Sequence, residues 1–285
     1  MEILELKGKS LIICGIVRDA ANGLKRNIPV ISDLCSYFGD YRIAIYENDS
    51  KDRTKDILSE WQRSDPKRIH VVTDKLGEGN SIPTEKEVRG NPFFSMKRIG
   101  KMAALRNKYI DYIIKEGWDA DYMVVVDMDV WSISLDGILS SFTSNMKWDA
   151  VTAFGYSTSP KLKRRYHDTY ALTEYGADNV PQTEQMIKSL AEKYASLAAS
   201  DEWIRVFSAF GGLAIYRYEC VRGLHYQVLP NEDAMVEVRC EHYSIYKQMA
   251  SQGDMNVYIN PRMKIKYQAL SWKIIWRSLK RKLCL

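Results

Sequence analysis

The sequence predicts an α/β protein with a mostly parallel central sheet flanked by helices. Strand-like and helix-like segments alternate three times near the amino end, and this alternation is typical of right-handed βαβ units. The run at 122–126 is apolar and rich in β-branched residues, as expected of a strand buried on both faces. The composition, 46% hydrophobic and 27% charged, is that of an ordinary globular protein. We therefore expect one continuous domain over residues 1–270.

The elements of the first part follow from apolar patterns. Residues 10–17 form an almost wholly apolar run and predict the first strand. The next segment is expected to be a helix with Pro29 near its beginning, because its apolar residues recur at spacings of three and four. These residues are Leu24, Ile28, Ile31, Leu34, Cys35 and Phe38. A strand at 41–46, a helix containing Ile57, Leu58 and Trp61, and a strand at 69–72 complete this part.

The second part is less regular. Gly, Pro and charged residues dominate 75–95, which predicts a loop. Between about 156 and 203 the strand–helix alternation stops, and we interpret this stretch as irregular. The remaining expected elements are helices at 95–115, 135–144, 183–200 and 233–251, and strands at 122–126, 150–154, 213–216 and 257–259.

Two carboxylates, Asp127 and Asp129, follow directly after the run at 122–126. Because side chains alternate along an extended segment, both can project to one side at the carboxyl edge of the sheet. Open α/β sheets bind ligands at that edge, and neighbouring carboxylates are commonly neutralised by a divalent cation that prefers oxygen ligands. A plainer interpretation is that the two acids mark where the strand reaches water. The segments upstream shift the balance toward a cation site.

Charge and cysteine usage limit the possible partners. The net charge is +5, and much of the excess lies at the carboxyl end within 273–282. This uneven distribution argues against nucleic-acid binding and suits a protein that handles anionic small molecules or touches an acidic surface. Five cysteines without CxxC spacing predict neither a disulfide framework nor a zinc site, and they favour a cytoplasmic location.

Several short motifs, taken in order, resemble those of the GT-A glycosyltransferases over most of residues 10–260. They are Arg18-Asp19, the segment 47–54, Ala104-Leu105-Arg106-Asn107, Asp127-Met128-Asp129, Gly211-Gly212 and Cys240-Glu241-His242. Tyr166-His167-Asp168-Thr169 makes the chain most similar to the capsule-associated mannosyltransferase-like group. The resemblance implies a GT-A fold with a nucleotide-binding half at 1–130 and an acceptor-binding half at 131–270. It also implies sugar transfer from a nucleotide-diphosphate donor to a saccharide or lipid-linked acceptor.

The same resemblance implies a Mn²⁺ or Mg²⁺ cofactor. In similar enzymes the second Asp binds the metal directly and the first reaches the ribose or a water, so Asp129 and Asp127 are expected to take these roles. Such a cation masks the charge of the diphosphate. Many of these enzymes add a His from a late strand, yet 260–267 contains none. We expect His242 to substitute for it, although a lone His is more often structural. The alternatives are His167, water, or a cation from Lys264 or Lys266.

Residues at the ends of the first two strands are expected to bind the nucleotide sugar. The resemblance places Val17 and Arg18 at the first strand and Glu47 and Asp49 at the second. A carboxylate there can accept from a base N–H or a ribose hydroxyl. The alternative is that 48–50 is only a turn, followed by a helix cap at Asp52 or Thr54.

The third group of expected site residues comes from later segments. Arg106 should pair with Asp49, Asp127 or the diphosphate, unless it lies with Arg98 on a solvated helix face. Gly211 and Gly212 would let the backbone approach the donor sugar, although a bulge or tight turn explains them equally well. Glu241, with Asp127, resembles the catalytic acids, and it would take the acceptor hydroxyl's proton in an inverting enzyme. Glu232 and Asp233 are its rivals.

Residues 271–285 predict a basic amphipathic helix. Its apolar residues fall at spacings of three and four, away from most of the cations; they are Trp272, Ile275, Trp276, Leu279 and Leu283. Trp with Lys and Arg is the composition of interfacial helices. We expect peripheral contact with the inner face of a membrane, unless this helix packs on the domain or on a partner chain.

Two other function classes stay open. A phosphatase of the haloacid dehalogenase type also has Asp-x-Asp after an apolar strand. Such enzymes usually carry the motif on their first strand, with Thr or Val two residues after the second Asp, where Trp131 stands here. A non-catalytic nucleotide- or carbohydrate-binding module would keep the fold and bind without turnover.

Overall fold

The computed structural model describes residues 3–77, 87–88, 90–159, 163–195 and 201–269. Within these, the helices are η1 (Ile3–Gly8), α1 (Ala21–Ser36), α2 (Thr54–Ser64), η2 (Pro92–Phe94), α3 (Met96–Lys115), α4 (Leu135–Phe142), α5 (Glu184–Lys193), α6 (Tyr218–Val221) and α7 (Glu241–Gln252). The strands are β1 (Ser10–Val17), β2 (Asp40–Asn48), β3 (Ile69–Asp74), β4 (Tyr122–Val126), β5 (Ser132–Ile133), β6 (Ala150–Thr158), β7 (Arg164–Tyr166), β8 (Thr173–Glu174), β9 (Ile204–Ser208), β10 (Leu213–Arg217) and β11 (Val257–Lys266).

One central sheet organises the described part of the chain. Its strands follow the order β3-β2-β1-β4-β10-β6-β11-β9-β8, with β5 beside β11 and β7 beside β6. The strands from β3 to β4 pair in parallel, as the βαβ pattern predicts, and so do β6 and β11. The strand β10 runs antiparallel to both β4 and β6. Parallel pairing therefore dominates the first half of the sheet, and the second half is mixed.

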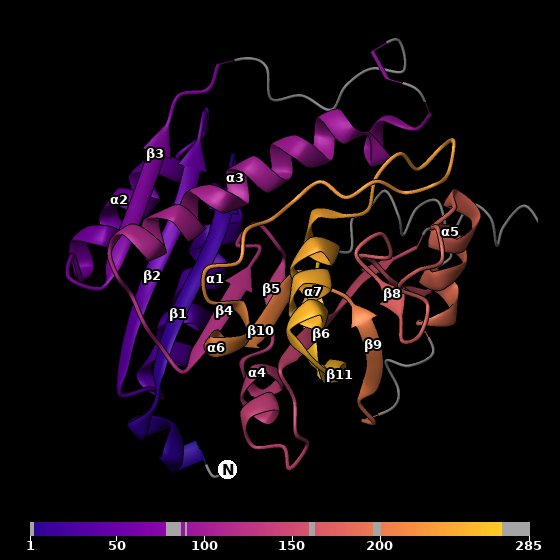
Figure 1. Ribbon diagram of the computed structural model, residues 1–285. Coiled ribbons are helices and arrows are strands. Elements are labelled where there is room, and N and C mark those ends of the chain that lie inside the picture. Colours follow the sequence, from indigo (N-terminus) through magenta and orange to yellow (C-terminus); the bar gives the residue numbers. More distant parts are fainter. Residues whose placement is uncertain (1–2, 78–86, 89, 160–162, 196–200, 270–285) are drawn as a thin grey trace, which may run out of the picture.

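Helices cover both faces of the sheet, and the strands bury side chains on both. Figure 1 shows α3 crossing in front of β1 and β2, with α1 and α2 on the far side. Along β4, Met123 and Val125 enter the core beneath α3 and α7, whereas Val124 and Val126 enter the core beneath α1 and α4. This alternation into two cores explains why the run at 122–126 has no polar position. The predicted α/β fold with a central sheet between helical layers is confirmed.

Most of the expected elements are present, with shifted ends. The strand expected at 41–46 continues to Asn48, so Glu47 is part of it. Pro29 lies inside α1 and not near its beginning. The stretch around 156–203, expected to be irregular, contains the rest of β6 and the short strands β7 and β8.

The helix expected at 233–251 begins only at Glu241. A long-range amide contact explains the delay, because Asn231 Nδ2 donates to the carbonyl oxygens of Val236 and Gln182 and holds this segment as a loop. Helix α5 ends at Lys193, before the expected end at 200. The expected basic helix at 271–285 lies outside the described residues. None of the described helices is both long and apolar enough to span a bilayer.

Candidate active site

The carboxyl ends of β1, β2 and β4 meet at one edge of the sheet. Val17 at the end of β1 pairs with Glu47 near the end of β2, and β1 also pairs with β4, which ends at Val126. The backbone N–H of Asp127 donates to the carbonyl of Gly212 at 2.9 Å and so joins this edge to the start of β10. The first acid of the Asp-x-Asp motif thus has its backbone position fixed by the sheet.

A buried arginine on α3 connects the start of α7 and the end of β4 at this edge. Arg106, on α3, is only 3% exposed. Its Nε donates to Glu241 Oε1 at 3.0 Å, and its Nη2 lies 3.6 Å from Asp127 Oδ1. Burial by itself would lower the pKa of Arg106, but Glu241 and Asp127 help to raise it well above its ordinary value. Arg106 is therefore a fixed cation between two acids and not part of a solvated helix face.

Aromatic rings enclose this arginine. The guanidinium carbon lies 5.1 Å from the Phe210 ring centre and 5.8 Å from that of Tyr226, within the range of cation–π attraction. The ring of His242 stacks on Phe210 at 3.8 Å, with an interplanar angle of 16°. Water is thus displaced from around the ion pair, and this strengthens its electrostatic attraction.

The site holds more negative charge than Arg106 neutralises. Burial raises the pKa of Asp127 to about 7, with Arg106 opposing and Asp129, Asp168 and Glu241 contributing. Burial likewise raises the pKa of Asp168 to about 6, although Oδ2 of Asp168 accepts the N–H of Gly211 at 3.1 Å. A bound cation would relieve this excess, and carboxylates with strongly raised pKa values are typical of functional sites.

Asp168 was not among the site residues expected from the sequence. Its segment, Tyr166-His167-Asp168-Thr169, entered the sequence argument only as a family-like motif. It follows β7, a three-residue strand that pairs with β6. A strand of this length has too few residues for its hydrophobic pattern to predict it. The available signal was an acid two residues after Tyr166, within this family-like motif.

Helix α1 positions the loop that carries the second acid. Asn27 is fully buried, and its Nδ2 donates to the carbonyls of Met128 at 2.9 Å and Val130 at 2.8 Å. At Gly23, a Cβ would lie 2.6 Å from the Cα of Asp129, so only glycine allows this approach. Asp129 itself is exposed, so its carboxylate is open to a ligand. The contacts of Asn27 and Gly23 are long-range and were missed from the sequence.

The two acids at the end of β2, Glu47 and Asp49, have different surroundings. Glu47 is fully buried, and its Oε1 accepts the N–H of Ser50 at 2.8 Å, while its Oε2 has no partner among the described residues. Asp49 has a φ of 54°, and its carboxylate accepts the N–H of Leu76 at 3.1 Å. Asp49 remains reachable by a ligand, whereas the Glu47 side chain closes its own turn.

The first two loops at this edge are tied to each other. The side-chain oxygen of Thr54 accepts the N–H of Ala20 at 2.7 Å, and Asp52 Oδ2 accepts that of Ala21 at 3.0 Å. These two residues therefore join the loop after β1 to the loop after β2. Asp52 Oδ1 also accepts the N–H of Thr54, the first residue of α2, at 2.9 Å, whereas Arg53, at the N-cap position itself, makes no side-chain cap bond. Val17, the last residue of β1, is buried, and Arg18, which follows it, is partly exposed.

The paired glycines form a tight turn. Gly211 and Gly212 have φ values of 64° and 89°, a region that disfavours other residues. A Cβ on Gly211 would lie 2.1 Å from the carbonyl oxygen of Ala153. These packing demands explain both glycines without a ligand, so the turn interpretation accounts for them.

The aspartates and His242 differ as possible metal ligands. The described residues contain no group of three or more His, Cys, Asp or Glu side chains arranged to hold a metal ion, so the expected set of Asp127, Asp129 and His242 is not assembled. The stacked ring of His242 is buried, and burial lowers its pKa well below the ordinary value. Asp127 and Asp129 fit a cation that draws its other ligands from phosphate oxygens and water.

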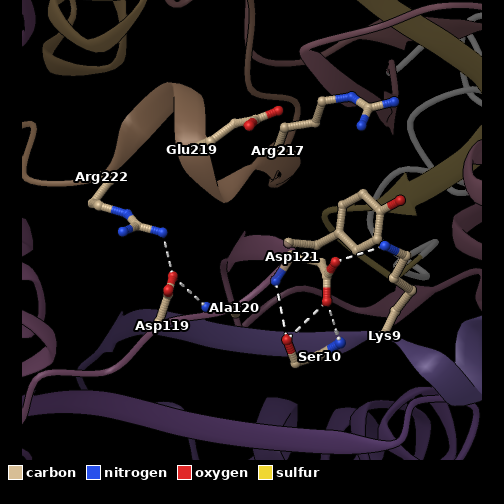
Figure 2. Close-up of a pocket in the computed structure, with 9 residues that line it drawn as sticks. Lys9, Ser10, Asp119, Ala120, Asp121, Arg217, Glu219 and Arg222 are labelled. Atoms are coloured by element: carbon tan, nitrogen blue, oxygen red, sulfur yellow. Dashed lines mark hydrogen bonds and ion pairs between the residues drawn. The ribbon is translucent and has the colours of Figure 1, made fainter.

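A second charged hollow lies at the opposite end of the same strands. Its cavity volume is about 490 Å³. Figure 2 shows two ion pairs in this hollow, Lys9 with Asp121 and Arg222 with Asp119. These side chains are largely exposed to solvent. The hollow therefore has no unbalanced buried charge.

Comparisons with known proteins place this geometry in context. A family model described as Cryptococcal mannosyltransferase 1 matches residues 10–247. That range includes the Arg106, Asp127 and Glu241 cluster. No curated protein matches the sequence.

Solved glycosyltransferase structures show a distant likeness. The mannosyltransferase PcManGT from Pyrobaculum calidifontis, in complex with GDP-Man and Mn²⁺, is 10% identical, with coverage of 97% of this chain and 65% of that chain and a TM-score of 0.48. TarS 1-349 from S. aureus is 9% identical, with coverage of 95% and 64% and a TM-score of 0.45. GalNAc-T7 with UDP, GalNAc and Mn²⁺ is 10% identical, with coverage of 95% and 48% and a TM-score of 0.46. The present chain spans less than two thirds of the length of each of these three structures.

Proposed function

The chain belongs to the Cryptococcal mannosyltransferase 1 family, and from this we propose that it is a glycosyltransferase. It would move a sugar from a nucleotide-diphosphate donor to a saccharide or lipid-linked acceptor. Mannose is the first donor sugar to test because of the family description. The observation that carries the proposal is the coincidence of the family match with a buried, charge-rich cluster at the carboxyl edge of a parallel sheet.

The residues of the site suit a pyrophosphate leaving group. Asp127 and Asp129 would hold a divalent cation, which supplies Lewis-acid stabilisation of a departing nucleoside diphosphate when it is bound. Arg106 holds the Asp127 carboxylate in place from the protein side. The aromatic rings of Phe210 and Tyr226 keep this ion pair dry. Arg18 and Asp49, at the ends of the first two strands, are the accessible residues for the nucleotide.

The acid that takes the acceptor's proton is part of the proposal. Glu241 has Oε1 bonded to Arg106 Nε, and the thiol of Cys240 lies 3.4 Å from Oε2. We therefore assign Glu241 a positioning role, in which it holds the Arg106 guanidinium in place. Asp168 is partly exposed, and its pKa of about 6 is close to what a general base at neutral pH needs. Asp168 is therefore the stronger candidate for proton removal.

Location and partners complete the proposal. We place the protein in the cytoplasm, in peripheral contact with the inner membrane face through residues 271–285. A lipid-linked acceptor would then be within reach of the site. Co-sedimentation with anionic liposomes, for the full chain and for a chain ending at 270, measures this contact.

A donor screen tests the proposed activity. The full chain is incubated with a panel of GDP- and UDP-sugars, with and without Mn²⁺, and release of nucleoside diphosphate is measured. We expect slow, metal-dependent hydrolysis of one donor, with GDP-mannose first in the panel. Asp129→Asn should reduce this rate by a factor on the order of 100, the usual effect of removing one group that stabilises the transition state.

A matched variant completes this screen. Asp136→Asn changes an exposed aspartate on α4, outside the cluster, and should leave donor hydrolysis unchanged. Phosphate release from unrelated esters without base preference would point to a phosphatase. Binding without turnover under every acceptor condition would point to a non-catalytic module.

A further inference from the structure

The carboxyl edge of the sheet continues beyond the candidate active site into the second half of the sheet. The strand β10 runs antiparallel to both β4 and β6, and β11 pairs with β6 in parallel, so β6 and β11 point the same way as β4. Their carboxyl ends therefore lie at the same edge as Asp127 and Asp129. The short strands β5 and β7 pair with the last residues of β11 and β6 and widen this edge on both sides.

Cations are concentrated on this part of the edge. Residues 163–166 and 264–267 contain five cations and no acid. Strand pairing brings the two segments together, because Tyr156 on β6 lies opposite Lys266 on one side and opposite Tyr166 on the other. The guanidinium carbon of Arg164 lies 4.7 Å from the centre of the Tyr156 ring. We call the five cations the basic edge; they are Lys163, Arg164, Arg165, Lys264 and Lys266.

The basic edge is accessible and carries an excess of positive charge. Its members near β7 are exposed, and Lys264 and Lys266 are partly exposed. Across the described ranges, none of the five has an acid within ion-pair distance. At the amino ends of the sheet, by contrast, Lys9 and Arg222 are each paired with an acid. The exposed Asp129 belongs to the proposed cation site, where a bound divalent ion would neutralise it.

A tryptophan lies beside these cations. Trp131 is 39% exposed, and its N–H donates to the carbonyl of Lys266 at 2.8 Å, so it adjoins the end of β11. Arg26 on α1 adds a further cation, because its Nε donates to the Trp131 carbonyl at 3.0 Å and its guanidinium carbon lies 4.3 Å from the ring centre. An exposed Trp among Lys and Arg is typical of protein surfaces at a membrane interface.

The segment that follows this edge in the chain has the same composition. Strand β11 ends at Lys266, and residues 271–285 come a few positions later. They include Trp272 and Trp276 together with further Lys and Arg residues. A folded surface and a following segment of the same composition favour one extended anionic partner, such as a bilayer, over a small soluble anion.

We propose that the basic edge and Trp131 bind the anionic surface of a lipid bilayer and orient the carboxyl edge of the sheet toward it. The cations attract the phosphate groups of the lipids, and the Trp131 ring enters the interface. The candidate active site lies at this edge, so a lipid-linked acceptor would be held close to Asp168. This inference rests on the proposed membrane contact, which it extends from residues 271–285 to the folded part of the chain.

Co-sedimentation of the full chain with two kinds of vesicle tests this surface. One kind contains phosphatidylcholine alone, and the other contains equal parts of phosphatidylcholine and phosphatidylglycerol. We expect binding to the anionic vesicles that weakens as salt is added, because ions screen exposed charges. Binding to the neutral vesicles should be at least about tenfold weaker.

A triple variant links binding to the basic edge. Arg164→Gln, Arg165→Gln and Lys266→Gln together remove three of its cations. The affinity for anionic vesicles should fall by a factor on the order of 100, because each cation near an anionic surface contributes roughly fivefold. Trp131→Gln keeps the backbone bonds to Lys266 and Arg26, and it should lower the affinity by roughly threefold through the loss of its partly exposed ring.

A second triple variant is the matched control. Lys67→Gln, Lys115→Gln and Lys147→Gln remove the same charge from exposed positions near the amino ends of β3, β4 and β6. These positions belong to the opposite edge of the sheet, so a bilayer bound at the basic edge should be screened from them. The affinity should stay within about twofold of the wild-type value.

Several outcomes overturn the proposal. It is wrong if the full chain binds neither kind of vesicle, or if it binds neutral vesicles as tightly as anionic ones. It is also wrong if the basic-edge variant, shown to be folded by circular dichroism, keeps wild-type affinity, or if the control variant loses as much. Binding of soluble alginate without binding of vesicles would instead assign the surface to an anionic saccharide.

The test separates this surface from the rest of the proposed function. If the chain ending at 270 loses vesicle binding while the basic-edge variant keeps it, residues 271–285 make the contact alone and the proposed surface is excluded. None of these measurements uses donor hydrolysis, so a negative transferase assay leaves the vesicle result intact.

Discussion

The two ends of β1 and β4 carry charged side chains under opposite conditions. At the amino ends, Lys9 and Asp121 form an ion pair of 2.8 Å with exposures of 41% and 33% (Figure 2). Near the carboxyl ends, Arg106 and Glu241 form an ion pair of 3.0 Å, and their side chains are only 4% and 5% exposed. The distances are nearly equal, and the difference lies in the surrounding solvent.

This difference separates a solvated surface from a functional site. Water screens the exposed pair, so it contributes little to stability. Around the buried pair there is little water, and each unpaired charge is therefore costly. At the carboxyl ends, burial raises the pKa of both Asp127 and Asp168, and the nearby Glu241 adds to this rise. Buried acids with raised pKa values are what a site that binds a cation and a diphosphate would contain.

The largest expected effect comes from Arg106→Met, which tests the buried end. The substitution leaves Glu241 buried without its cation, and breaking such a pair costs about 3–5 kcal/mol. Urea unfolding monitored by circular dichroism measures the change in the free energy of unfolding. The double variant Arg106→Met with Glu241→Gln should recover part of the loss, because the stranded charge is removed. If the single variant lost less than about 1 kcal/mol of unfolding free energy, the buried pair would contribute no more to stability than the exposed Lys9–Asp121 pair, and the prediction would be wrong.

An intermediate effect is expected from Asp168→Asn and depends on pH. The folded-state pKa of Asp168, about 6, exceeds its ordinary value of 3.8, so the unfolded chain loses this proton first as the pH rises. Stability should therefore fall between about pH 4 and pH 6, by about 1–3 kcal/mol. In Asp168→Asn this part of the pH dependence should vanish. Urea midpoints measured from pH 4 to pH 8 compare the two proteins, and identical profiles would contradict the raised pKa.

The smallest effect is expected from Lys9→Met at the exposed end. The ion pair with Asp121 is partly solvated, so its loss should cost less than about 1 kcal/mol. The difference should shrink further in 1 M salt, because ions screen exposed charges. Thermal unfolding at low and high salt measures it. Lys9→Met should also leave donor hydrolysis unchanged, and a large activity loss would mean that the two ends are coupled.

Local pattern predicted the parts of the site that belong to single segments. The apolar run at 122–126 predicted β4, and the acids Asp127 and Asp129 follow it as expected. Helix α3 begins after Ser95, whose side chain accepts the N–H of Arg98. These features depend on neighbours within a few residues, so they can be read along the chain.

The sequence by itself determined the α/β class, the order of the main strands and helices, and the two acids at a strand end. Only the tertiary structure decided that Arg106 bonds to Glu241, 135 residues away, that Asn27 holds the loop of Asp129, and that Asp168 joins the acids. The physical reason is that burial and long-range pairing set these charges. Both depend on how the helices pack on the sheet, which no local pattern encodes.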